Sequence, residues 1–108
     1  MVPITFDHAR LLLGRDVAWA EEAVNDLVRP ALAQGQFDCL VLFVFNVGRA
    51  AFGASHVRTR VNEGKFDAVP AELRKWINAG GKRLAGLVKR REAEIALWNG
   101  THMRTQEV

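Results

Sequence analysis

The feature that most constrains the fold is an unbroken apolar run from Cys39 to Phe45, followed three residues later by Gly48. A run of this length is compatible with a buried strand, but no second segment alternates apolar and polar residues as a partner strand would. The spacing of the apolar positions fits one face of a helix, and the extra apolar residues are typical of a helix enclosed by others. We therefore predict a central helix from Gln36 to Gly48, with Gly48 as its left-handed stop.

Amphipathic spacing predicts a long helix before this segment. It should run from about Thr5, its N-cap, to Arg29, because Pro30 blocks its continuation. A turn of small residues is expected over 49–54, and Ser55 should cap a short helix after it.

Two further helices are expected in the second half of the chain. The first should run from Pro70 to about Asn78 and carry Trp76 and Ile77. The second, over residues 84–99, should end at Gly100. Its apolar stripe consists of Leu84, Leu87, Val88, Ile95 and Trp98, with Arg91 on the same face.

The elements together predict an all-α fold, a single small helical bundle of about five helices around a buried central helix. With 108 residues, of which 49% are hydrophobic, the chain is expected to form one domain. We place this domain at residues 1–100 and expect a mobile tail at 101–108. The lone cysteine, Cys39, excludes an internal disulfide and is expected to lie in the core.

The basic residues are unevenly distributed. Residues 1–48 carry three basic and six acidic side chains, whereas residues 49–108 carry twelve basic and six acidic ones. One side of the molecule could therefore attract an anionic partner. A solvated basic surface is the alternative, and nucleic acid binding is not expected because only the charge asymmetry favours it. The residues expected to form an anionic-partner surface are Arg49, Arg58, Arg60, Lys82 and Arg83.

No residue type or spacing predicts a catalytic group, a metal site or a cofactor. The histidines His8, His56 and His102 have no ligand-type partner at a suitable spacing and are expected on the surface. A glycosidase needs one carboxylic acid whose pKa is raised by an apolar pocket. The candidate carboxylates are expected on polar helix faces as solvated groups; they are Asp16, Glu21, Glu22, Asp26, Asp38, Glu92 and Glu94.

Several segments in their order and spacing closely resemble the C-terminal lobe of phage-type lysozymes, the endolysin muramidases of tailed phages and prophages. The resemblance extends from about Ile4 to Gly100. Its carriers are Asp16-Val17-Ala18-Trp19-Ala20-Glu21-Glu22-Ala23-Val24-Asn25, Gln34-Gly35-Gln36-Phe37-Asp38-Cys39-Leu40, Phe43-Val44-Phe45-Asn46-Val47-Gly48, Leu73-Arg74-Lys75-Trp76-Ile77-Asn78-Ala79-Gly80-Gly81-Lys82 and Gly86-Leu87-Val88-Lys89-Arg90-Arg91-Glu92-Ala93-Glu94.

The resemblance implies a lysozyme-like fold without the family's catalytic groups. That family cleaves peptidoglycan between N-acetylmuramic acid and N-acetylglucosamine, using a glutamate on an N-terminal helix and an aspartate and a threonine in a small β-lobe. No position here matches those three residues, so no catalytic residue is carried over. The family's cleft wall does match, and it implies glycan or stem-peptide contacts at Phe45, Asn46, Gly48, Trp76 and Asn78. The alternative is that Phe45 and Trp76 only pack the core.

We therefore expect a phage- or prophage-derived protein that acts by binding. Its partner would be peptidoglycan or a protein such as a host defence or lysis component. The absence of the catalytic helix should expose an apolar surface, so a homodimer or a stable protein partner is expected there. The alternative is a muramidase whose active site is completed by another chain. Without a signal peptide or a membrane-spanning stretch, the chain is expected in the cytoplasm of a phage-infected or lysogenic bacterial host, with no membrane partner.

Overall fold

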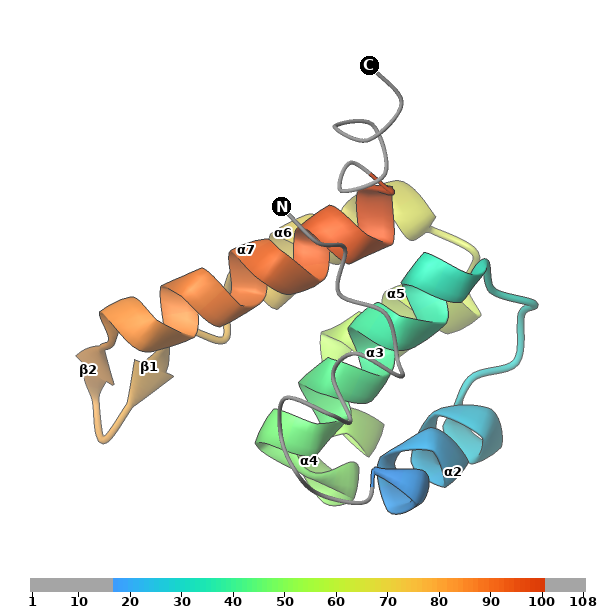
Figure 1. The fold of residues 1–108 in the computed structure, drawn as a ribbon, viewed down its shortest axis with the longest axis horizontal. Helices are drawn as coiled ribbons and strands as arrows, with labels where there is room; N and C mark the ends of the chain where they lie inside the picture. Colours follow the sequence, from blue (N-terminus) through green and yellow to red (C-terminus); the bar gives the residue numbers. More distant parts are fainter. Residues whose placement is uncertain (1–16, 101–108) are drawn as a thin grey trace.

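The computed structural model describes residues 17–100, and this part of the chain is mainly helical (Figure 1). The prediction of an all-α fold is confirmed. The expected N-cap at Thr5, His8, Asp16, His102 and the tail lie outside the described residues. The single long helix predicted from Thr5 to Arg29 is wrong, because Val17 is the non-helical N-cap of a helix that runs only from Ala18 to Leu27. Within 17–100 the elements are α2 (Ala18–Leu27), α3 (Gln34–Val47), α4 (Arg49–Gly53), α5 (His56–Asn62), a 3-10 helix (Phe66–Ala68), α6 (Val69–Leu73), β1 (Asn78–Ala79), β2 (Lys82–Arg83) and α7 (Ala85–Asn99).

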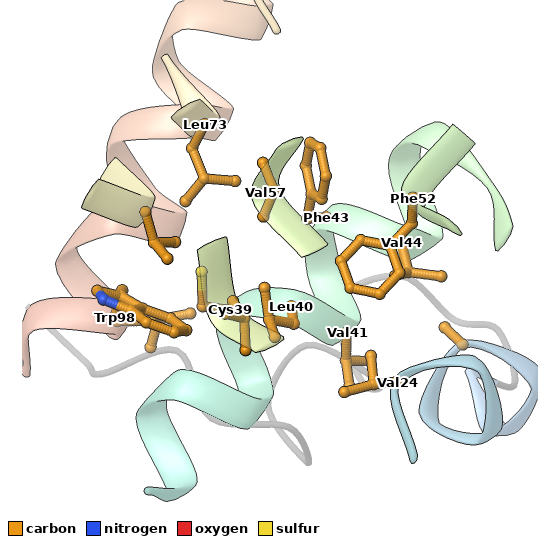
Figure 2. Packing of buried hydrophobic residues seen from close by; sticks show 14 of the residues in the cluster. Val24, Cys39, Leu40, Val41, Phe43, Val44, Phe52, Val57, Leu73 and Trp98 are labelled. Carbon is orange, nitrogen blue, oxygen red and sulfur yellow. The ribbon is translucent and has the colours of Figure 1, made fainter. Parts of the chain in front are cut away.

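Helix α3 is the centre of this fold, as its apolar run predicts. It lies between α7 and α2 and packs against both (Figure 1). Its side chains point into a continuous apolar core that also receives residues from α2, α4, α5, α6 and α7 (Figure 2). Cys39, Leu40, Phe43 and Val44 are completely buried. The hydrophobic free energy of burying such side chains, about 1.5–3 kcal/mol each, explains why this helix organises the domain.

The chain changes direction at Gly48 and is helical again from Arg49. Gly48 is the C-cap of α3, so the helix ends at the predicted glycine, but its φ of +95° and ψ of 159° are not the left-handed helical geometry predicted for it. The predicted turn over 49–54 is wrong, because Arg49–Gly53 form the short helix α4. Phe52 holds this helix in place, since its ring is completely buried and contacts the ring of Phe43 edge-on at 6.2 Å.

Helix α5 begins at the predicted cap. The Ser55 hydroxyl accepts a hydrogen bond from the backbone N–H of Arg58 at 3.1 Å and donates one to the carbonyl of Phe52 at 2.7 Å. The Ser55 hydroxyl therefore both donates and accepts a hydrogen bond, and its side chain is buried. The short helix after Ser55 is confirmed over His56–Asn62.

The helix predicted from Pro70 to Asn78 ends earlier, at Leu73. Trp76 and Ile77 are not helical, and the chain continues into an antiparallel hairpin in which Asn78 pairs with Arg83 and Ala79 with Lys82. The turn consists of Gly80 and Gly81, whose φ angles are +57° and +77°. Positive φ at both central positions is the geometry of a two-residue hairpin turn, which glycine adopts without steric cost.

Helix α7 begins directly after the hairpin and ends at Gly100, the predicted stop, which has left-handed geometry. Burial along α7 differs from the predicted stripe at its start, because Leu84 is 42% exposed. Ile95 and Trp98 are buried as expected, together with Arg91. None of the helices within residues 17–100 has both the length and the apolar character that crossing a bilayer requires.

Candidate functional site

A buried guanidinium joins three of the segments that the sequence singled out. The Arg91 side chain on α7 is 1% exposed. Its Nη2 donates to Asn46 Oδ1 at 2.6 Å, at the end of α3, and its Nη1 donates to the backbone carbonyl of Trp76 at 3.4 Å. Arg91 therefore fixes the position of two predicted cleft-wall residues relative to each other.

The fourth member of this cluster is Glu94, one helical turn after Arg91. Arg91 Nη2 donates to Glu94 Oε2 at 3.2 Å, and Arg91 Nε lies 3.0 Å from Glu94 Oε1. Nε and Oε1 are in ion-pair contact, but neither atom makes a well-aligned hydrogen bond. The guanidinium also lies over the ring of Phe43, 5.0 Å from its centroid, in a cation–π arrangement.

Burial dominates the electrostatics of this pair. Removal from water disfavours the charged carboxylate and raises the pKa of Glu94 to about 8, although Arg91 and Arg90 act in the opposite direction. The same desolvation lowers the pKa of Arg91. The expectation that Glu94 is a solvated group is therefore wrong, because its side chain is 3% exposed.

Asp38 and Cys39 on α3 are buried as well. Asp38, also expected on a solvated face, is 2% exposed, and its Oδ1 accepts a hydrogen bond from Gln34 Nε2 at 2.8 Å. Cys39 is completely buried, and this burial is the main cause that raises the pKa of its thiol. A buried neutral thiol is not poised for nucleophilic chemistry. No group of three or more potential metal ligands occurs among residues 17–100.

The aromatic residues of the predicted cleft wall also support the core. The rings of Trp76 and Phe43 pack edge-on, with 5.3 Å between their centroids. The centroid of the Phe45 ring lies 5.8 Å from that of Trp19 on α2. Trp76 and Phe45 are partly buried against the apolar cluster, whereas Trp19 is 44% exposed. Packing accounts for the inner sides of Trp76 and Phe45, and their remaining exposed surface is what a ligand could contact.

The other two predicted wall residues lie at backbone turns. Gly48 connects α3 to α4, and its carbonyl accepts a hydrogen bond from the N–H of Phe52 at 3.1 Å. Asn78 is exposed on β1 and is directly opposite Arg83 on β2. Because opposite residues of an antiparallel pair share a face, Asn78 and Arg83 present their side chains on the same side of the hairpin.

The predicted anionic-partner surface separates into two groups. Three of its members are engaged inside the described part of the chain. Arg49 contacts Asp26 at 3.3 Å, and Arg60 pairs with Glu63 at 2.9 Å. Arg58 donates from Nε to the carbonyl of Leu27 at 2.8 Å.

Lys82 and Arg83 form the second group. Both are exposed on β2, on the opposite side of α3 from α2 (Figure 1). The structure therefore does not gather the five predicted cations into one patch. A surface pocket lined by Gly64, Lys65, Phe66, Asp67 and Ala68 contains none of the predicted site residues.

The resemblance groups Asn46, Trp76 and Asn78 in one wall, but it does not include the Arg91–Glu94 pair, whose arginine contacts Asn46 and the Trp76 carbonyl. The available signal was an arginine on the apolar stripe of α7 with a glutamate three residues later. Residues at i and i+3 share a helix face, so a charged pair on an apolar stripe indicates a buried ion pair.

Comparisons with known proteins agree with this architecture. The family model described as phage lysozyme matches residues 1–94. The endolysin of Bacillus phage PZA is 41% identical over 96 residues, which cover 89% of this chain and 37% of that protein. The endolysin of Acyrthosiphon pisum secondary endosymbiont phage 1 is 38% identical over 99 residues, covering 88% of this chain and 68% of that protein. The chain thus spans between about one third and two thirds of these relatives.

Two solved structures have the same arrangement of helices. The muramidase domain of SpmX from Asticaccaulis excentricus superposes with a TM-score of 0.74 at 41% identity, and the match covers 88% of this chain and 67% of that one. A mutant of P22 lysozyme superposes with a TM-score of 0.73 at 35% identity, covering 89% of this chain and 65% of that one.

Proposed function

The chain belongs to the phage lysozyme family, and from this premise we propose that residues 17–100 bind peptidoglycan and do not themselves supply the groups that cleave it. The observation that carries the proposal is that the Glu94 side chain is buried and paired with Arg91. Glu94 has a carboxyl group with the raised pKa that a general acid needs, but its side chain is 3% exposed and paired with Arg91. A general acid must come within about 2.6–3.2 Å of the oxygen that it protonates, which a buried, paired carboxyl cannot do.

The binding wall in this proposal consists of Asn46, Trp76 and Asn78. Arg91 donates to Asn46 Oδ1, so the orientation of the Asn46 amide is fixed before a ligand arrives. Trp76 is held edge-on against Phe43, and aromatic rings of this kind offer an apolar face to sugars. Asn78 is exposed on the adjacent hairpin. Preorganised polar groups beside an aromatic ring suit recognition of a glycan, since little side-chain freedom is lost on binding.

The second candidate is a muramidase whose catalytic carboxyls come from outside residues 17–100, for example from another chain. The specific observation in its favour is that the relatives are endolysins and that one matching structure is a muramidase domain. In this alternative the same wall would hold the substrate. The two candidates therefore share a binding site and differ in whether the glycan is cut.

A sedimentation assay with purified peptidoglycan, stripped of attached anionic polymers, tests binding. Co-sedimentation of the chain is expected, and it should weaken with Asn46→Ala and with Asn78→Ala. Asn78 is exposed, so its variant tests the contact without endangering the fold. Arg49→Ala, at the α2–α4 side of the molecule, is the matched control and should bind like the parent. Equal binding by all variants would contradict the assigned wall.

Turbidity clearing of bacterial cell walls separates binding from cleavage. We expect no clearing by the chain alone, because loss of a general acid lowers a rate by about 10²–10⁴-fold. Clearing by the chain alone at rates usual for lysozymes would overturn the binding proposal. Clearing only after addition of a second chain that carries a glutamate would favour the muramidase alternative.

A further inference from the structure

Four exposed cations gather where the hairpin meets helix α7. Lys82 and Arg83 form β2, and Lys89 and Arg90 lie four and five residues into α7. At 1.5 Å per residue, Lys89 and Arg90 are only about 6–8 Å along the helix axis from its start. Figure 1 shows the hairpin at the extremity of the molecule, next to the first turns of α7. Because consecutive strand residues point to opposite sides, Lys82 and Arg83 lie on the two sides of the hairpin. We call these four residues together the basic hairpin face.

Nearby acidic groups do not neutralise this face. Lys82, Arg83, Lys89 and Arg90 make no ion pair among the described residues, in contrast to most other cations there. The acidic groups of α7 are used elsewhere. Glu92 accepts two hydrogen bonds from Arg74, at 2.9 and 3.1 Å, and Glu94 is buried with Arg91. The first turn of α7 contains no acidic residue.

The residues between these cations are small, so an extended ligand can approach closely. The exposed neighbours are Ala79, Gly80, Gly81, Ala85 and Gly86. The one large exposed hydrophobic residue beside these cations is Leu84. The aromatic residue nearest to them in the sequence, Trp76, is partly buried against the core. Sequence-independent binding of single-stranded nucleic acid relies on aromatic residues on which bases stack, and the described part of this face offers none. A single leucine also provides little apolar surface to insert into a bilayer.

We propose that the basic hairpin face binds a linear phosphodiester polymer without aromatic bases, of the kind found as an anionic component of cell walls. Such a polymer presents closely spaced negative charges along a flexible chain, which four neighbouring cations can neutralise together. The lysine and arginine side chains provide both point charges and planar forks for phosphate oxygens. This surface adjoins the proposed glycan wall at Asn78, which pairs with Arg83, but the proposal does not depend on the function proposed above.

The salt dependence of binding measures how many cations take part. With linear inorganic polyphosphate as the probe, four neutralised charges predict a slope of about −2.8 for log K against log salt concentration, by analogy with single-stranded polyanions. Affinity should then fall roughly 50-fold between 50 and 200 mM salt. Isothermal titration at several salt concentrations gives this slope. A slope near zero, or no binding at 50 mM salt, would overturn the proposal.

A pair of charge-matched variants locates the site. Lys82→Gln/Arg83→Gln should reduce the slope by about half, to roughly −1.4. Arg49→Gln/Lys65→Gln removes the same net charge from other parts of the surface and should keep the parent slope. Circular dichroism checks that both variants keep their helical content. Equal slopes for the two variants would mean that only net charge matters, and the assigned face would be wrong.

Two competing ligands test the class of partner. Single-stranded DNA of equal charge and vesicles containing phosphatidylglycerol are titrated under the same conditions. Polyphosphate binding at least as tight as that of DNA or vesicles supports the proposal. Tighter binding of DNA or of vesicles would overturn it in favour of a nucleic acid or a membrane surface. Because polyphosphate contains no glycan, this result is independent of the peptidoglycan sedimentation assay.

Discussion

The guanidinium of Arg91 lies where the end of α3, the segment before the hairpin and α7 meet. It contacts the Asn46 side chain, the Trp76 carbonyl and the Glu94 carboxylate, so one residue satisfies acceptors from three parts of the chain. Buried ion pairs of this type contribute little net stability as such, because desolvation offsets the attraction. Here the pair determines side-chain positions, since the Arg91 guanidinium that binds Glu94 also orients Asn46.

Removing Arg91 should be costly for that reason. Arg91→Met deprives the Glu94 carboxyl, the Asn46 side chain and the Trp76 carbonyl of a donor, and leaving buried acceptors unsatisfied costs about 1–3 kcal/mol. Urea denaturation followed by circular dichroism measures this loss. Arg74→Met is the matched control, because Arg74 also pairs with a glutamate of α7, Glu92, but is exposed. Exposed ion pairs contribute about 0–1 kcal/mol. Equal losses for the two variants would contradict a special role for Arg91.

The stability of the domain should also depend on pH through Glu94. Its pKa is raised to about 8 in the fold, from an ordinary value of 4.5, so the folded state holds the proton more tightly than the unfolded state. The contribution of Glu94 is therefore complete below about pH 4.5 and is lost as the pH rises toward 8. Denaturation at pH 5, 6.5 and 8 should show falling stability, and Glu94→Gln should flatten this trend. A parallel fall in the variant would assign the pH dependence to other groups.

Among the helices, α5 has a structural task that the sequence did not reveal. Arg58 Nε and Asn62 Nδ2 donate to the carbonyl of Leu27 at 2.8 and 2.9 Å, and the backbone N–H of Arg29 donates to Asn62 Oδ1. Helix ends leave carbonyls without intrahelical partners. Side chains from α5 therefore complete the C-terminal end of α2 and fix the connection that leads to α3.

This contact gives a prediction about Arg58. Arg58→Met should lower the free energy of unfolding by about 1–3 kcal/mol, because Leu27 loses a charged donor and Gly53 loses the one from Arg58 Nη1. Arg49→Met, whose exposed side chain pairs with Asp26, should change it by at most about 1 kcal/mol. Chemical denaturation of both variants compares the two. An unchanged denaturation midpoint for Arg58→Met would mean that the Arg58 side chain does not contribute to the stability of the fold.

The central and the last helix are predictable from their local pattern, whereas the interruption of the first predicted helix at Val17 and the short elements set by distant contacts are not. Helix α3 and the end of α7 at Gly100 follow from local sequence, because apolar spacing and glycine geometry decide them. Helix α4 depends on burial of Phe52, and the early end of α6 accompanies the packing of Trp76 on Phe43. The buried Arg91–Glu94 pair has a local signal in the spacing of the two residues on α7, but the contact of Arg91 with Asn46 joins residues that are 45 positions apart and has none.

The charged side chains of residues 17–100 are arranged in two different ways. Around α2, α4 and α5, basic side chains are paired with acidic ones or donate to backbone carbonyls. At the hairpin and the start of α7 they are exposed and unpaired within the described residues, next to Asn78 of the proposed glycan wall. Arg83 and Asn78 share a face of the hairpin, so a polyanion and a glycan strand could be held side by side. Among residues 49–100, the basic side chains that have no ion pair or backbone acceptor therefore lie at one end of the described structure.

The size of the exposed apolar surface limits how strongly the chain could form the expected homodimer. Trp19 and Leu84 are the exposed large hydrophobic residues within the described part, and Trp19 lies against Phe45. At 44% exposure, covering the indole ring removes on the order of 100 Å² per protomer from water, or roughly 2–3 kcal/mol. Two such contacts give about 5 kcal/mol, whereas micromolar association needs a net 8 kcal/mol or so after the cost of association.

We therefore predict that a dimer formed through Trp19 is weak. Sedimentation velocity should show a monomer at about 10 μM and self-association only above millimolar concentrations, because the cost of association offsets most of the roughly 5 kcal/mol that the two contacts contribute. Trp19→Gln should abolish the association, and Leu84→Gln, which lies at the hairpin end, should leave it unchanged. A dimer that is stable at 10 μM and survives Trp19→Gln would contradict this interface, because its free energy would then have to come from a surface that does not include the exposed indole.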